Sequence, residues 1–186
     1  MTGNEAVLRM IDALDAMSVS YMLTGSYASN VFGIARSTQD ADFVVELGQT
    51  SLSQIAGRLG NSFRVDPQMS FETITGTSRY VIQLRDSPFK IELFLLSDDA
   101  HDRERFQRRQ PGTALGRTVW MPTAEDVVIT KLRWSKLGRR SKDVDDVRNV
   151  IAVQGDRLDW DYIYRWCDTH GTRALLDEVR ASLPPL

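Results

Sequence analysis

Cysteine is almost absent from this chain of 186 residues, in which Cys167 stands alone. A single cysteine excludes an internal disulfide and a zinc site made only of cysteines, and such usage is typical of a reducing compartment. No apolar run approaches the ~20 residues of a membrane-spanning helix. The stretch MTGNEAVLRM at the N-terminus contains an acidic residue and lacks the apolar segment of a signal peptide. We therefore expect a cytoplasmic protein without a membrane segment.

An excess of charge of either sign is also missing, since Lys and Arg number 23 and Asp and Glu number 25. The formal net charge of −2 argues against a globally basic nucleic-acid-binding protein, although local basic patches stay open. Internal repeats and the Gly-Lys-Ser/Thr signature of a Walker phosphate loop are absent as well. Hydrophobic residues make up 42% of the chain, enough for the core of one domain, or of one domain with a helical appendage.

The hydrophobic periodicity divides the chain near residue 121. Before this point we expect helices at 4–17, 26–32, 51–59 and 101–109, and strands at 20–24, 41–47, 79–85, 89–96 and 117–121. After it we expect only helices, at 123–137, 142–154, 159–169 and 172–182. A short turn at 86–88 joins two strands as an antiparallel hairpin. This order predicts an α+β fold, with a mixed sheet flanked by helices over residues 1–121 and a C-terminal helical bundle over 122–186.

Gly25 and Ser26 lie where a predicted strand passes into a predicted helix. A helix N-terminus offers backbone N–H groups and a positive dipole end, which suit phosphate, and glycine lets the phosphate approach closely. For the pair taken alone, an ordinary turn with Ser26 as the helix cap is the simpler explanation. Residues Asp40 and Asp42 share one face of the next strand, because side chains alternate along a strand. Two such carboxylates either hold a Mg²⁺ ion or are solvated acids at a strand edge.

Glu92 is an acid in the otherwise apolar strand FKIELFLL, at 89–96. A carboxylate buried alone is costly, so Glu92 needs a partner. Lys90 lies two residues along, about 7 Å away, and is expected to be too far to serve. A metal shared with Asp40 and Asp42 is one candidate partner. Three carboxylates on neighbouring strands can hold two Mg²⁺ ions and support phosphoryl transfer.

These residues resemble a known signature. Gly25-Ser26, then RSTQDAD at 36–42, then the acid of IELF at 91–94 resemble the motif of the nucleotidyltransferase superfamily typified by DNA polymerase beta. PTAEDVVITKL at 122–132 and RRSKDVDD at 139–146 are similar to motifs of small bacterial members, which include the AbiEii-like toxin nucleotidyltransferases. Together the matches cover roughly residues 20–150.

The resemblance implies a role for each matching residue. Asp40 and Asp42 would bind two Mg²⁺ ions that bridge a nucleoside triphosphate, and Glu92 would complete this metal and catalytic site. The nucleotide itself would be bound by Gly25, Ser26, Arg36, Thr38, Lys131, Lys142 and Asp143. The resemblance implies an Mg²⁺-dependent enzyme that transfers NMP from an NTP to an acceptor hydroxyl and releases pyrophosphate. The acceptor would be tRNA or protein if the chain is toxin-like, with a cognate antitoxin as a partner.

Several residues have a second interpretation. Arg36 can pair with a phosphate or with Asp40, and Lys131 can reach the cleft or extend along an apolar helix face to solvent. Arg139, Lys142, Asp143 and Asp146 are spaced for ion pairs within one helix. The basic stretches RERFQRR at 103–109 and KLRWSKLGRRSK at 131–142 suit an RNA backbone or a solvated helix face. The two histidines, His101 and His170, lack ligand spacing, and Cys167 is expected to be buried.

Two further functions stay open. One keeps the fold and changes the acceptor to a small molecule such as an aminoglycoside or lincosamide antibiotic, since a pI of 5.7 suits a cationic drug. The other is a catalytically silent module that binds a nucleotide or a partner protein.

Overall fold

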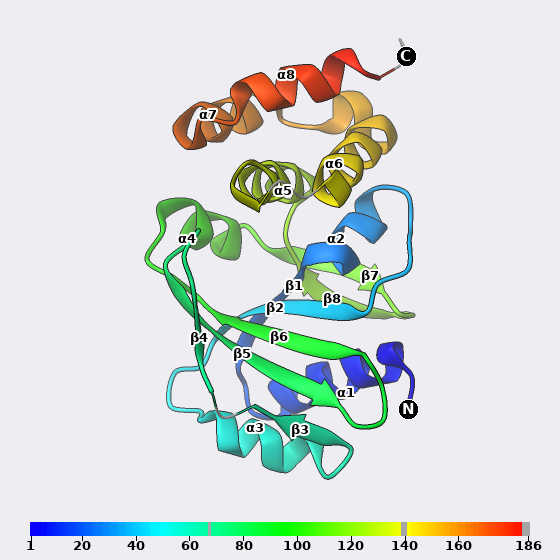
Figure 1. Ribbon diagram of the computed structural model, residues 1–186, viewed down its shortest axis with the longest axis vertical. Helices are drawn as coiled ribbons and strands as arrows, with labels where there is room; N and C mark the ends of the chain where they lie inside the picture. The colour runs from blue at the N-terminus through cyan, green and yellow to red at the C-terminus, as the bar shows by residue number, and fades with distance from the viewer. Residues whose placement is uncertain (67, 139–140, 184–186) are drawn as a thin grey trace.

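The computed structural model describes residues 1–66, 68–138 and 141–183 (Figure 1). The helices are α1 Gly3–Ala16, α2 Gly25–Phe32, α3 Leu52–Leu59, α4 Ala100–Gln107, α5 Ala124–Gly138, α6 Ser141–Gln154, α7 Trp160–His170 and α8 Arg173–Ala181, with a 3₁₀ turn at Gly155–Arg157. The strands are β1 Ser20–Thr24, β2 Asp40–Glu46, β3 Phe63–Val65, β4 Ser70–Glu72, β5 Thr77–Leu84, β6 Lys90–Leu95, β7 Gln110–Ala114 and β8 Arg117–Met121. None of the helices in these ranges is long and apolar enough to cross a membrane.

The main sheet is mixed, as the sequence predicts. Its strands follow the order β1-β2-β6-β5-β3, and β4 pairs with β5. The central pair, β2 and β6, is parallel and aligns Asp42 with Glu92 and Asp40 with Lys90, whereas the other pairs are antiparallel. Strands β7 and β8 form a separate two-stranded ribbon, and β8 lies beside β1.

The predicted α+β fold is confirmed, and each predicted helix and strand is found near its expected position. The hairpin of β5 and β6 is confirmed too, with Asp86 in the left-handed region at its turn (φ 57°). Three short strands were not predicted from the sequence, namely β3, β4 and β7. The first two have only 3 residues each, and β7 contains Pro111 and Gly112, which are poor strand formers.

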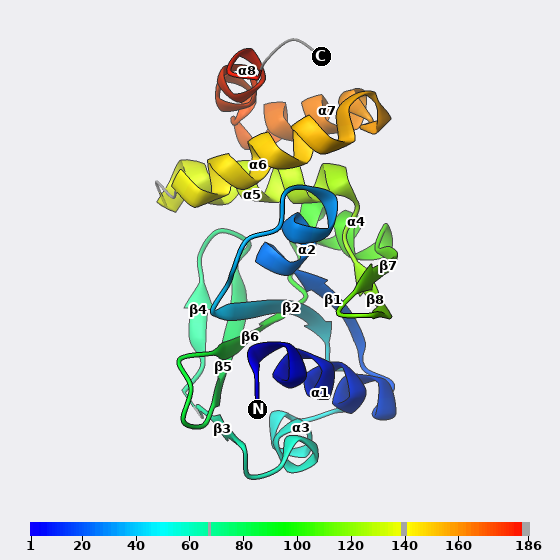
Figure 2. The ribbon, with the colours of Figure 1, turned by 90° about the vertical axis from the view of Figure 1, so that its right-hand side faces the viewer.

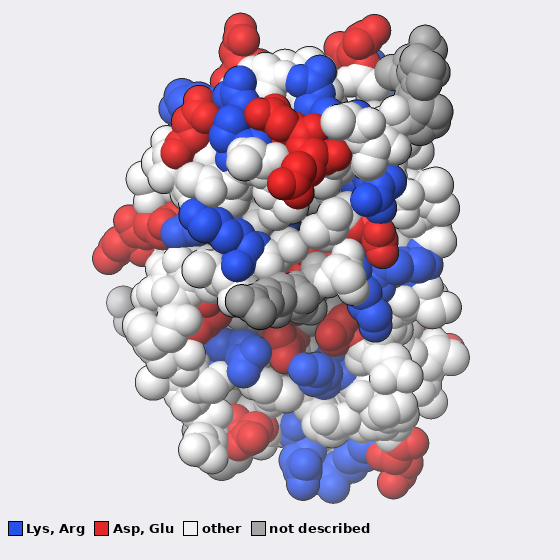
Figure 3. Space-filling view, turned by 45° about the horizontal axis from the view of Figure 1, so that its top comes forward, with Lys and Arg blue, Asp and Glu red and all other residues white. Residues whose placement is uncertain are grey.

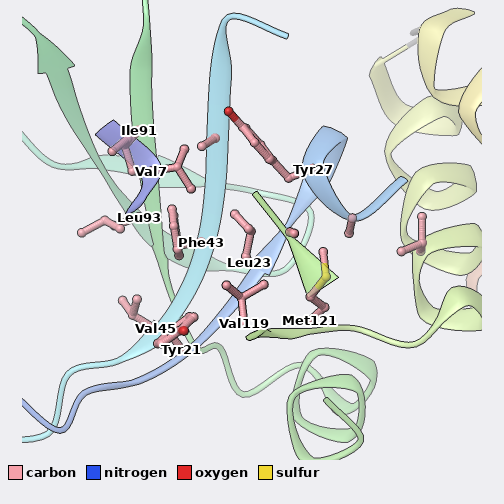
Figure 4. Close-up of a cluster of buried hydrophobic side chains, with 14 of the residues drawn as sticks. Val7, Tyr21, Leu23, Tyr27, Phe43, Val45, Ile91, Leu93, Val119 and Met121 are labelled. Atoms are coloured by element: carbon pink, nitrogen blue, oxygen red, sulfur yellow. The ribbon is translucent and has the colours of Figure 1, made fainter. Parts of the chain in front are cut away.

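One face of the sheet carries the hydrophobic core. Phe43 of β2 and Leu93 of β6 are fully buried, and Figure 4 shows their side chains near Val7 of α1. The core cluster runs without interruption from α1 to α8, so the helical region shares it with the sheet. The opposite face of the central strands is apolar only in a small cluster that includes Val44 and Phe94. This face therefore has room for polar side chains.

The C-terminal helices lie over one end of the sheet. Helices α5 and α6 pack on each other and on α2, while α7 and α8 lie farther from the sheet (Figures 1 and 2). Helix α4 follows β6 and lies beneath α5 and α7 at the side of the molecule (Figure 1). This arrangement places α2, α4, α5 and α6 around the polar ends of β2 and β6.

Candidate functional site

The N-terminus of α2 meets the carboxylate of Asp42. Gly25 begins the helix in the left-handed region (φ 61°), and a Cβ atom at this position would lie 1.9 Å from Asp42 Oδ2. Only glycine fits there, because both the backbone angle and the approach of Asp42 exclude a side chain. The N-cap residue is Thr24, whose side chain makes no capping bond, so the alternative interpretation of Ser26 as the helix cap does not hold. Ser26 instead lies inside the first turn and is buried.

Asp40 and Asp42 project from the same face of β2, as predicted, while Ala41 and Phe43 are buried in the core. Asp40 is oriented by Thr38, whose hydroxyl donates to Asp40 Oδ1 at 2.7 Å. Asp42 is positioned by the β1–β2 pairing, which aligns it with Thr24. Asp42 therefore lies against the start of α2, and Asp40 lines the same cavity as Gly25 and Ser26.

Glu92 lies directly across from Asp42 and is 7% exposed. Its carboxylate accepts a hydrogen bond from Lys90 Nζ at 2.6 Å and lies 3.6 Å from Arg79 Nη1. The prediction that Lys90 is too far to be its partner is wrong. The distance of about 7 Å separates the two Cα positions, and the flexible four-carbon lysine side chain spans it.

The predicted metal ligands do not converge in this structure. In the ranges that the structure describes, no group of three or more His, Cys, Asp or Glu side chains is arranged to hold an ion. The contacts of Glu92 give one reason, since Lys90 and Arg79 hold its carboxylate. The roles of Asp40, Asp42 and Glu92 as metal ligands stay predictions.

A buried ion network ties α5 and α6 to the loop after α2. Lys131 Nζ lies 2.9 Å from both Asp143 Oδ1 and Asp146 Oδ2. Arg36 donates through Nε and Nη2 to the two oxygens of Asp146, each at 2.8 Å, and through Nη2 to Ser26 Oγ at 3.1 Å. Burial raises the pKa of Asp146, but hydrogen bonds from Arg36 and Lys131 outweigh it and hold the pKa below its ordinary value.

This network bears on three interpretations of the sequence. Arg36 pairs with Asp146 rather than with Asp40. Asp143 and Asp146 both bind Lys131 of α5, and Asp146 also binds Arg36, so these two acids bind cations from other elements. Lys131 is 9% exposed and lies in the cleft instead of extending to solvent, and Lys142 is exposed at the start of α6. Arg139 lies outside the described residues.

One cavity of about 220 Å³ joins these parts. Among the predicted residues, it is lined by Gly25, Ser26, Asp40, Asp42, Glu92, Lys131 and Asp143. Arg36, Thr38 and Lys142 do not line it, although the first two contact lining residues. On the face of the molecule that Figure 3 draws, acidic and basic side chains lie next to one another across the middle.

Other cavity residues were missed by sequence reasoning. The ring of Trp134 on α5 meets Phe94 edge to face, with centroids 6.1 Å apart. Thr130 also lines the cavity, and its hydroxyl is buried without a hydrogen-bond partner in the part of the chain that the structure describes. The cationic residues Arg79 and Arg105 line it too. Arg105 lay in a stretch that looked like a solvated basic helix, and no local pattern marks it as buried.

The basic stretches are largely engaged within the protein. Arg133 pairs with Asp99 at 2.8 Å, Lys136 donates to the carbonyl of His170 at 3.1 Å, and Trp134 packs on Phe94. An exposed platform for RNA bases is therefore absent from the described part of residues 131–142.

The two histidines, on α4 and α7, lie close together. The rings of His101 and His170 are 5.2 Å apart, and His101 Nε2 lies 3.1 Å from Asp126 Oδ1. Tyr162 donates to the same carboxylate at 2.7 Å, which joins α7 to α5. Burial lowers the pKa of His170 to about 4, with a contribution from the charge of Arg133. Cys167 is buried nearby in the core, as expected.

Comparison with known proteins finds similarity at the level of structure. No protein-family model and no curated protein matches the chain. The structure of ANT(2")-Ia in complex with adenylyl-2"-tobramycin is similar, with a TM-score of 0.64 and 14% identity over 94% of this chain and 99% of that one. An antigenic nucleotidyltransferase-like protein from Paracoccidioides brasiliensis has a TM-score of 0.55 and 15% identity over 94% and 90%. The lincomycin-bound lincosamide antibiotic adenylyltransferase LnuA has a TM-score of 0.51 and 12% identity over 80% and 96%.

Proposed function

We propose that this chain, whose fold is that of the nucleotidyltransferase superfamily, transfers a nucleoside monophosphate from an NTP to an acceptor hydroxyl. The acceptor oxygen would bond to the α-phosphorus while the bond between that phosphorus and the bridging oxygen to the β-phosphate breaks. Pyrophosphate would leave, and the hydroxyl proton would pass to a carboxylate of the site or to water. The observation that carries the proposal is the contact of Gly25 with Asp42, which joins a helix N-terminus to the acidic strand face.

The start of α2 suits the triphosphate. Its backbone N–H groups and dipole attract anions, and the side chain of Thr24 makes no capping bond there. Ser26 lines the cavity at the same end, and Lys131 contributes a cationic side chain from α5. We propose that these residues hold the phosphates, and that Trp134 offers an aromatic surface near the base.

The site also suits Mg²⁺, which prefers carboxylate oxygens and shares them with phosphate. Asp40 and Asp42 offer such oxygens from one strand face beside the phosphate-binding helix end. When bound, the ions would neutralise charge on the phosphates. Glu92 would join Asp40 and Asp42 once its contacts with Lys90 and Arg79 open.

The charges in the cavity favour an acceptor that is not a polycation. Three of the carboxylates that line the cavity lie in ion pairs with protein cations, namely Glu92 with Lys90, Asp102 with Arg105 and Asp143 with Lys131. A cationic drug would have to compete with these pairs. We therefore propose that the acceptor is a hydroxyl of tRNA or of a protein. From the sequence resemblance we propose that the chain is a member of the AbiEii-like subgroup, with a toxin-like role and a cognate antitoxin as partner.

A small-molecule acceptor is the second candidate. ANT(2")-Ia and LnuA were solved with an adenylylated tobramycin and with lincomycin, and this chain covers 99% and 96% of their lengths. The similarity in size and fold supports an antibiotic acceptor, and the internal ion pairs of the cavity oppose a polycationic one.

One experiment separates the candidates. The protein is incubated with Mg²⁺ and each NTP, labelled at the α-phosphate, together with total tRNA, tobramycin or lincomycin. Label on tRNA or on the protein itself would support the first proposal, and label on a drug would support the second. No transfer to any acceptor, together with no calorimetric binding of any NTP, would contradict both and favour a silent module.

A further inference from the structure

Arg105 is a buried cation at the phosphate end of the cavity. It comes from α4, is 6% exposed and lines the cavity together with Thr24, Gly25 and Ser26. Its Nη1 atom lies 3.5 Å from the hydroxyl oxygen of Thr24, the residue that caps α2. An arginine from a distant part of the chain thus reaches the place where the triphosphate is expected.

Asp102 holds this guanidinium in one orientation. Arg105 Nε donates to Asp102 Oδ1 at 2.7 Å, and the other oxygen, Oδ2, accepts from the backbone N–H of Ser97 at 3.1 Å and from its hydroxyl at 2.8 Å. Burial raises the pKa of Asp102, but the charge of Arg105 and the bonds from Ser97 bring it below its ordinary value. The carboxylate therefore stays ionised and keeps Arg105 in place.

The bonds to Asp102 and Thr24 do not use every donor of Arg105. A guanidinium has five N–H groups in a planar fork, which matches two oxygens of a phosphate at once. Nε and Nη2 contact Asp102 Oδ1 at 2.7 and 2.5 Å, and Nη1 lies near the hydroxyl of Thr24, so these contacts account for three of the five N–H groups of a side chain that lines the cavity. Such a preformed cation loses little conformational entropy when a phosphate binds.

The other cations near the cavity are placed differently. Arg36 donates through Nε and Nη2 to Asp146 and through Nη1 to the carbonyl of Ser37, and Lys131 lies between Asp143 and Asp146. Arg79 and Lys90 lie on the sheet beside Glu92, with side chains that are 35% and 40% exposed. Arg105 combines burial with direct contact to the residue that precedes α2.

We propose that Arg105 is a phosphate-binding residue of this site, oriented by Asp102, and that it contacts the triphosphate beside the N-terminus of α2. This inference rests on the proposed function. Its ligand class is a polyphosphate with Mg²⁺, and recognition by Arg105 is independent of the base.

The test measures the binding of inorganic tripolyphosphate and Mg²⁺ by calorimetry. We expect Arg105→Met to weaken binding by about 10- to 100-fold, the usual range for a charged hydrogen bond. Arg105→Lys should lose less, since it keeps the charge without the planar fork. Arg103→Met is the matched control on the same helix, because its side chain is 45% exposed and pairs with the solvent-exposed Asp98.

One further variant and a measurement of unfolding separate a loss of binding from misfolding. Arg105→Met leaves the Asp102 carboxylate without its cation, so thermal unfolding is measured for it and for the double variant with Asp102→Asn, which removes both charges. A folded Arg105→Met or double variant that binds tripolyphosphate as tightly as the natural protein would overturn this inference. Absence of tripolyphosphate binding by the natural protein would overturn it as well. The label-transfer experiment tests the proposed function separately and does not depend on either result.

Discussion

Gly25 and Asp42 are packed so closely that a Cβ atom on Gly25 would lie 1.9 Å from Asp42 Oδ2. We predict that Gly25→Ala abolishes transfer, because the methyl group must displace the carboxylate or distort the start of α2. Gly48 is the matched control. It has a similar positive φ of 55°, but a Cβ atom there would meet no neighbour within 4 Å.

Both alanine variants should lose about 1 kcal/mol of stability from backbone strain, and Gly25→Ala should lose more because its methyl group also clashes with Asp42. Only Gly25→Ala should lose transfer as well, as measured by label transfer and chemical unfolding. Equal activity of the two variants would mean that the Gly25–Asp42 contact has no part in the reaction.

Asp40 and Asp42 supply the acidic strand face. We predict that Asp40→Asn together with Asp42→Asn abolishes NMP transfer and leaves the fold intact, because both side chains are partly exposed and keep their size. The control is Asp98→Asn, whose side chain is 98% exposed. Undiminished transfer by the double variant, measured beside its circular dichroism spectrum, would sink the proposed mechanism.

Asp146 is the shared partner of two cations. We predict that Asp146→Asn destabilises the protein by about 2–4 kcal/mol, because Lys131 is left buried with fewer compensating charges. Asp145→Asn should change stability by less than about 1 kcal/mol, since Asp145 pairs with Arg148 at the surface. Urea unfolding of the two variants measures the difference. Similar small losses in both would show that the buried network contributes little.

The lowered pKa of His170 should make the stability of the protein depend on pH. Its folded-state pKa, about 4, lies below the ordinary value of 6.5 because partial burial disfavours the charged ring. As the pH falls, the unfolded chain therefore takes up a proton at His170 before the folded protein does. The contribution of neutral His170 to the free energy of unfolding is complete above about pH 6.5 and is lost as the pH falls toward 4. His170→Phe keeps the ring and removes this titration. Its unfolding free energy should fall less between pH 7 and pH 4 than that of the natural protein, and an identical pH profile would contradict the assignment.

Much of the fold could be read from local patterns. Alternation in a strand placed Ala41 and Phe43 in the core and Asp40 and Asp42 on the other face, and helical periodicity located the C-terminal helices. These predictions succeed because each depends on residues that are near one another in the sequence. Strands β3, β4 and β7 were not predicted, because pairing with other segments stabilises them and their own composition does not favour a strand.

Only part of the candidate site could be predicted from the sequence. The resemblance pointed to Gly25, Ser26, Asp40, Asp42 and Glu92, and the structure brings these residues to one cavity. Arg105 and Trp134 gave no local signal, because nothing in a basic stretch tells which side chain turns inward. The error over Lys90 arose from treating a Cα separation as the reach of a flexible side chain.

By itself, the sequence determined the order of the elements, the face on which each strand acid lies and the glycine at the start of α2. Only the tertiary structure decided the electrostatic partners. Arg36 and Asp146 are 110 residues apart and meet because α6 packs over α2, and Arg105 reaches Thr24 from 81 residues away. Ion pairing depends on distance in space, and that distance is set when the helices and the sheet pack together.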